Sequence, residues 1–143
     1  MLKGIPKIIP PELLKILMEM GHGDEIVISD GNFPSAGMAQ RLVRCDGHGA
    51  AEVLEAVLRF FPLDSYVDAP AALMELAPGD DVETPIWETY KEIINKYEPE
   101  NNKVENVERF AFYERAKKAY AVVATGESAL YANIILKKGV VTQ

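Results

Sequence analysis

The chain contains little of what would mark a secreted or membrane protein. It has a single cysteine, Cys45, which excludes an internal disulfide framework and suits a reducing compartment. No apolar run approaches the ~20 residues that a membrane-spanning helix requires, and the N-terminal residues lack the apolar core of a signal peptide. We therefore expect a cytoplasmic protein with no membrane partner.

Positive charge is also scarce. Fifteen Lys and Arg stand against 22 Asp and Glu, which gives a formal net charge of −7. A negative protein is repelled by phosphate backbones and anionic lipids, so we expect no nucleic acid partner. The apolar fraction of 48% and the charged fraction of 26% are typical of a globular domain. The length predicts a single domain over residues 1–143.

Apolar periodicity predicts helices alternating with short strands. The helices are expected at residues 11–20, 53–61, 85–97 and 112–119, and the strands at 26–28, 42–45, 71–76, 121–124 and 134–136. Gly21 is expected to end the first helix in a left-handed conformation, and residues 31–35 are expected to form a loop. The alternation is typical of an α/β layered domain.

His22 is the first candidate for proton chemistry. It lies between Gly21 and Gly23, so little side-chain bulk beside it would keep a ligand away. Histidine is also the side chain whose ordinary pKa lies near physiological pH. The alternative interpretation is a histidine in a surface turn without a chemical role.

Further polar residues occur where the predicted elements begin or end, and such positions commonly line the ligand crevice of α/β proteins. They form three groups: His22 with Asp24 and Asp30, Arg109 just before a helix, and Tyr131 with Asn133. Together they offer a proton-transfer group, a carboxylate, a guanidinium, a phenol and an amide. This set suits a polyhydroxylated ligand, because each hydroxyl both donates and accepts hydrogen bonds.

Each of these residues also has a purely structural interpretation. Asp30 could belong to a turn, and Tyr131 could be an aromatic residue at the rim of the core. Arg109 could form a surface ion pair with Glu105 or Glu108, which would contribute little to stability.

Several other chemistries lack their residues. The sequence has no serine elbow, no Walker phosphate loop and no cysteine set for zinc. One histidine with two carboxylates, His22 with Asp24 and Asp30, is sparse for a closed zinc site. We therefore expect no metal site.

Segments that carry a family resemblance occur in order along nearly the whole chain. They include Leu2-Lys3-Gly4-Ile5-Pro6, Met20-Gly21-His22-Gly23-Asp24-Glu25-Ile26, Leu63-Asp64-Ser65-Tyr66, Phe112-Tyr113-Glu114-Arg115-Ala116 and Lys138-Gly139-Val140. With these segments the chain resembles the family of L-fucose mutarotases, which are relatives of the bacterial D-ribose pyranases. The resemblance implies a ribose-pyranase-like fold, in which a mixed central sheet is flanked by helices.

The resemblance also implies an activity and a site. Family members interconvert the α and β anomers of a reducing sugar without a cofactor. His22 matches the catalytic general acid, and Asp30, Arg109 and the segment Tyr131-Ala132-Asn133 match sugar-binding positions. We expect His22 to donate a proton to the ring oxygen, and Asp30 to accept sugar hydroxyls and to help orient the imidazole. Either water or Tyr131 would take the anomeric proton.

The resemblance leaves the sugar and the assembly open. Ala132 is typical of the ribose branch, whereas Arg109 and the Phe-Tyr-Glu-Arg segment are typical of the fucose branch. The alternatives are a D-ribose pyranase and a non-catalytic monosaccharide-binding protein. Family members form ring-like homo-oligomers, often decamers, with sites near subunit contacts, so a neighbouring chain could complete the pocket.

Overall fold

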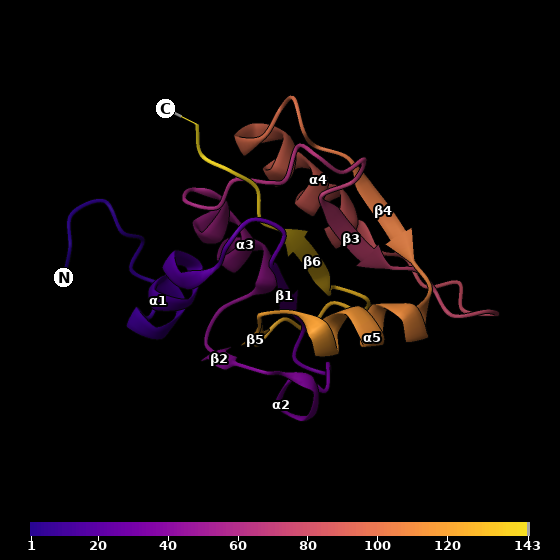
Figure 1. The fold of residues 1–143 in the computed structure, drawn as a ribbon. Helices are drawn as coiled ribbons and strands as arrows, with labels where there is room; N and C mark the ends of the chain where they lie inside the picture. Colours follow the sequence, from indigo (N-terminus) through magenta and orange to yellow (C-terminus); the bar gives the residue numbers. More distant parts are fainter. Residues whose placement is uncertain (143) are drawn as a thin grey trace.

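The computed structural model describes residues 1–142, which form five helices around one six-stranded sheet (Figure 1). The helices are α1 (Pro11–Glu19), α2 (Ser35–Met38), α3 (Ala50–Leu58), α4 (Pro85–Tyr97) and α5 (Arg109–Lys118). The strands are β1 (Glu25–Ser29), β2 (Leu42–Cys45), β3 (Ala71–Met74), β4 (Val104–Val107), β5 (Ala121–Thr125) and β6 (Ile134–Lys137). None of these helices is long and apolar enough to span a bilayer.

The sheet is mixed, as the resemblance implies, and its strand order is β2-β5-β1-β6-β3-β4. Only β6 runs against its neighbours β1 and β3, so the other five strands all point the same way. Their carboxyl ends lie together along what we call the carboxyl edge, where β6 begins. At the opposite side, the amino edge, β1 begins and β6 ends.

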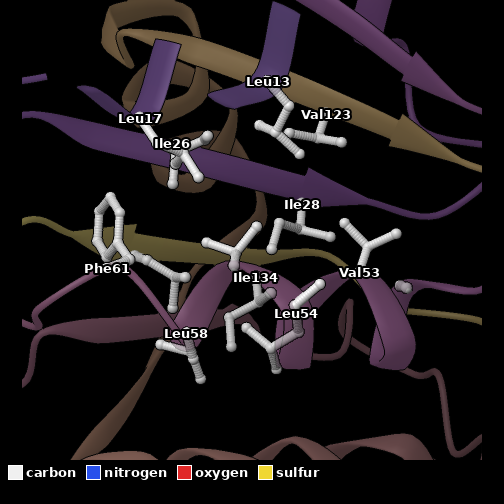
Figure 2. Packing of buried hydrophobic residues seen from close by; sticks show 14 of the residues in the cluster. Leu13, Leu17, Ile26, Ile28, Val53, Leu54, Leu58, Phe61, Val123 and Ile134 are labelled. Atoms are coloured by element: carbon white, nitrogen blue, oxygen red, sulfur yellow. The ribbon is translucent and has the colours of Figure 1, made fainter. Parts of the chain in front are cut away.

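Helices cover both faces of the sheet, because its strands are apolar on both sides. Ile26 and Ile28 of β1 pack in one cluster with residues of α1, α3 and α4, while Val27 packs in a second cluster with α5. Figure 2 shows Leu13 and Leu17 from α1, together with side chains of α3, packed around β1 and β6. Each fully buried aliphatic side chain of this kind stabilises the fold by about 1.5–3 kcal/mol.

The expected helices and strands are confirmed, and two further elements were not expected. β4 reads Val-Glu-Asn-Val, and its two middle residues are exposed because it lies at the outer edge of the sheet. Such a short, half-polar edge strand has little apolar signal. The second element is α2, a four-residue helix that starts at Ser35, where a loop was expected.

The prediction for the end of α1 is wrong in its detail. The helix ends before Met20, which is extended, and the positive φ of 88° belongs to Gly23 instead of Gly21. The amide of Asp24 donates to the carbonyl of Gly21 at 3.1 Å, and the Asp24 carboxylate accepts from the Gly21 amide at 2.8 Å. A positive φ at the third residue of such a turn is the pattern of type II. His22 therefore lies at the second position of a fixed turn.

Candidate functional site

A pocket of about 250 Å³ opens at the carboxyl edge of the sheet. Its volume is just below the ~300–1,000 Å³ typical of pockets for drug-sized ligands, so it suits a smaller molecule. Ten residues from four stretches of the chain line it: Asp30, Asn32, Phe33, Pro34, Met74, Arg109, Tyr113, Leu130, Tyr131 and Asn133. Four of the residues singled out in the sequence thus lie in one pocket.

Asp30 follows β1 and supplies the carboxylate of the pocket. It is only 6% exposed, and its two oxygens accept hydrogen bonds from the amides of Asn32 at 3.0 Å and Ala132 at 3.3 Å. Burial raises the pKa of Asp30 above its ordinary value, although these amides oppose the shift. Each oxygen retains a lone pair with which it can accept a ligand hydroxyl.

The segment Tyr131-Ala132-Asn133 leads into β6 and closes another side of the pocket. Tyr131 has a φ of 55°, a left-handed conformation that costs an ordinary residue about 1–2 kcal/mol. Asn133 accepts the Asp30 amide with its Oδ1 at 2.8 Å, which leaves its NH₂ group to donate to a ligand. Ala132 is completely buried and contacts Asp30 through its backbone, so its methyl group does not line the pocket.

Arg109 is the first residue of α5 and follows the carboxyl end of β4 by two residues. Its Nε donates to the hydroxyl of Tyr113, one helical turn later, at 3.2 Å. The surface ion pair considered from the sequence does not form: Arg115 binds Glu105, and Glu108 caps α5 by accepting the Ala111 amide at 3.0 Å. The other guanidinium nitrogens of Arg109 remain available for a ligand in the pocket.

His22 lies at the amino edge, where it contacts a carboxylate that the sequence reasoning did not identify. Its Nε2 is 3.0 Å from Oδ1 of Asp64, and its ring centroid is 5.2 Å from that of Tyr66. The His22 side chain is 46% exposed, whereas the Asp64 side chain is 4% exposed. His22 is therefore a half-exposed imidazole fixed from beneath by a buried carboxylate.

Asp64 is held by the end of β6. Its amide donates to the carbonyl of Lys137 at 3.0 Å, and Gly139 lies so close to this segment that a Cβ there would be 2.6 Å from the carbonyl oxygen of Leu63. Burial acts to raise the pKa of Asp64, but hydrogen bonds from the Tyr66 amide and the imidazole outweigh it, and the pKa lies below its ordinary value.

An ionised carboxylate only accepts hydrogen bonds, so the Nε2 of His22 must carry a proton. In the neutral imidazole, Nδ1 therefore has the free lone pair and can take up a proton. In the imidazolium, the proton on Nδ1 is the one that can be released, because the proton on Nε2 is bonded to Asp64. The pair of His22 and Asp64 thus leaves Nδ1 as the ring nitrogen that can take up or release a proton.

His22 and Asp30 lie on opposite edges of the sheet, although only seven residues separate them in the sequence. β1 lies between them, and its five residues span roughly 15 Å. The expectation that Asp30 orients the imidazole is therefore wrong, and Asp64 takes that place. The same separation prevents His22, Asp24 and Asp30 from sharing one ion, and residues 1–142 contain no other such group of three potential ligands.

Two site residues missed by the residue-level reasoning had a signal in the sequence. Asp64 belongs to the segment Leu63-Asp64-Ser65-Tyr66, which contributed to the resemblance. Tyr113 follows Arg109 by four residues, a spacing that places both side chains on one helix face.

Comparisons with known proteins agree with this architecture. Over 140 residues the chain is 54% identical to an L-fucose mutarotase from Actinobacillus pleuropneumoniae, with 98% of this chain and 97% of that protein covered. Its structure is similar to FucU from Bifidobacterium longum, with a TM-score of 0.95 and 59% identity over 98% of this chain and 100% of that one.

A second solved structure contains a sugar. It is the fucose mutarotase from Streptococcus pneumoniae in complex with L-fucose, with a TM-score of 0.93 and 55% identity over 99% of this chain and 100% of that one. Residues 3–141 of the present chain match the family described as the RbsD / FucU transport protein family. With nearly its whole length matched, the chain belongs to the RbsD / FucU family.

Proposed function

We propose that this chain is an enzyme, an L-fucose mutarotase that interconverts the α and β anomers of L-fucopyranose. The observation that carries the proposal is the near-complete match to a mutarotase crystallised with L-fucose. The pocket at the carboxyl edge supports it, because its carboxylate, guanidinium and amide can bind several hydroxyls at once. Phe33, Met74 and Leu130 provide an apolar wall beside these groups.

Anomer interconversion needs only proton transfers. One proton goes to the ring oxygen and another leaves the anomeric hydroxyl, while the bond between the anomeric carbon and the ring oxygen breaks. The open aldehyde then rotates and closes on its other face, with the protons returning in reverse. We assign the first transfer to Nδ1 of His22, with Asp64 stabilising the imidazolium. An acid or base in this position contributes roughly 10²–10⁴-fold to the rate.

Tyr113 is our candidate for relaying the anomeric proton: its hydroxyl oxygen receives this proton while its own O–H proton passes to water. Its hydroxyl oxygen accepts a hydrogen bond from Arg109 at 3.2 Å, so its own O–H is directed elsewhere in the pocket. Tyr131, the group considered from the sequence, has its phenol engaged: it donates to Asp80 at 2.6 Å and accepts from the Ala77 amide at 3.2 Å. Tyr131 is thus better placed to offer its ring to the sugar.

One sugar cannot touch both His22 and the pocket of the same chain, because β1 separates them by roughly 15 Å. We therefore propose that the site is shared between two subunits, with His22 and Asp64 of one reaching the pocket of the next. A contact between two different surfaces is heterologous, and repeated heterologous contacts form a ring where the rotation between subunits closes. This geometry supports a ring-like homo-oligomer such as a decamer. We further place the enzyme in the cytoplasm, which suits its one reduced, buried cysteine.

Saturation-transfer NMR on L-fucose tests the function. Saturating one anomeric signal should reduce the other in the presence of the protein, and a chelator should leave this transfer unchanged. The same measurement on D-ribose separates a pyranase, which would accelerate pyranose–furanose exchange preferentially. Binding of L-fucose without faster exchange would contradict the proposal and indicate a non-catalytic sugar-binding protein.

A further inference from the structure

The left-handed turn at Tyr131 is held from outside the pocket by α4. Tyr131 is the one residue other than glycine with a positive φ among residues 1–142. Such a conformation persists only where the surrounding structure fixes it. The contacts that fix it therefore identify residues on which the pocket depends.

Two aromatic donors of α4 bind consecutive carbonyl groups of this turn. Nε1 of Trp87 donates to the carbonyl of Tyr131 at 2.8 Å, and the hydroxyl of Tyr90 donates to that of Ala132 at 2.6 Å. The two donors are three residues apart, which places them on one face of the helix. Tyr90 is completely buried, and burial raises the pKa of its phenol above the ordinary value, so it stays a protonated donor.

The turn transmits this constraint to the carboxylate of the pocket. The Ala132 amide donates to Oδ2 of Asp30, and the Asn133 side chain accepts the Asp30 amide. The carbonyl and amide of Ala132 thus connect α4 on one side to Asp30 on the other. A tilt of this peptide segment would move the hydrogen-bond donor away from the carboxylate.

We infer that Trp87 and Tyr90 are positioning residues for sugar binding, acting through the turn at Tyr131 on Asp30. The inference rests on the proposed function for its effect on catalysis, but its effect on Asp30 can be measured without any activity. Neither side chain lines the pocket, so neither is expected to touch the sugar.

The test compares Trp87→Phe and Tyr90→Phe with a matched control on the same helix. Tyr97→Phe also removes a hydroxyl from α4, one that donates to Glu55 at 3.2 Å far from the turn. Trp87→Phe removes the indole N–H but keeps an aromatic ring, and Tyr90→Phe removes a single oxygen. Circular dichroism establishes that each variant is folded, and the two test variants probe the same turn independently.

The primary measurement is the pKa of the Asp30 carboxyl by carbon NMR titration. Loss of the Ala132 amide should raise this pKa further in both test variants, whereas Tyr97→Phe should match the wild type. The other charged groups that face Asp30, Glu127 and Arg109, are unchanged in all of them. Anomer exchange should fall by about tenfold or more in the test variants alone, since small misplacements of positioning groups are costly.

An Asp30 pKa that is the same in Trp87→Phe, Tyr90→Phe and Tyr97→Phe would overturn the inference. Failure of the proposed function would look different: the wild type would not accelerate fucose exchange, while the Asp30 pKa would still separate the two test variants from the control.

Discussion

His22 and His48 share the same local sequence, a histidine between two glycines, but differ in what lies beneath the ring. Nδ1 of His48 is 3.2 Å from the exposed carboxylate of Glu52, one helical turn away at the start of α3. The ring of His22 instead contacts the buried carboxylate of Asp64, which comes from a distant part of the chain. Only the second arrangement holds the ring against a buried carboxylate, and for this reason we propose His22 as the proton-transfer group.

The pair of histidines supplies a direct test of this assignment. His22→Ala should lower fucose anomer exchange by roughly 10²–10⁴-fold, because the acid–base group is lost. His48→Ala should leave exchange at the wild-type rate. Both side chains are partly exposed, so neither change should unfold the protein. Saturation-transfer NMR on the two variants checks the prediction, and equal rates in both would remove His22 from its role.

Asp30 should give the enzyme an acid limb in its pH profile. The ionised carboxylate accepts hydrogen bonds at both oxygens, whereas protonation turns one oxygen into a donor. Burial raises the pKa of Asp30 above the ordinary value of 3.8. As the pH falls through this raised pKa, Asp30 takes up a proton, and exchange should decline before an exposed aspartate would titrate. Rates of fucose exchange measured between about pH 3 and 7 would show the limb. A profile that stays flat down to the ordinary pKa would contradict the assignment.

The turn between α1 and β1 depends on the backbone freedom of one glycine. Gly23 has a φ of 88°, and a Cβ there would meet no atom within 4 Å, so the cost of a side chain is purely conformational. Gly23→Ala should reduce the free energy of unfolding by about 1 kcal/mol. It should also lower activity, since the turn carries His22.

Gly37 provides the control for that change. It lies in α2 with no atom within 4 Å and no positive φ, and alanine favours a helix by about 0.5–1 kcal/mol over glycine. Gly37→Ala should therefore be neutral or slightly stabilising. Urea unfolding of both variants at one fixed protein concentration measures the difference. A similar loss of stability in both would show that the backbone at Gly23 is not the cause.

Helices and strands with a full apolar face could be predicted from the sequence, because their buried apolar residues recur with the period of the helix or the strand. α4 is such a case, with Tyr90 and Ile94 buried one turn apart. β4 could not be predicted, since its Glu105 and Asn106 are exposed at the edge of the sheet. The conformation of Gly21 was also mispredicted, because the side chain of Asp24 closes the turn around it.

The arrangement of the whole sheet explains which features of the site could be predicted from the sequence. Asp30, Arg109 and Asn133 lie together because five parallel strands end, and β6 begins, at one edge. That grouping follows from the general placement of ligands at strand ends and was predicted. The separation of His22 from Asp30 was not predicted. The two residues are close in the sequence, which suggested that they are close in space, but β1 lies between them and places them at opposite edges of the sheet.

Subunit mixing tests the shared site most directly. His22→Ala keeps the pocket intact, and Arg109→Ala keeps the pair of His22 and Asp64 intact. Each variant alone should accelerate fucose anomer exchange only weakly. If sites form between neighbouring subunits, co-assembly of the two in equal amounts should restore about a quarter of the wild-type exchange rate, because one site in four combines two intact halves. If the mixture is no more active than the separate variants, the two halves do not meet on one sugar, and the account is contradicted.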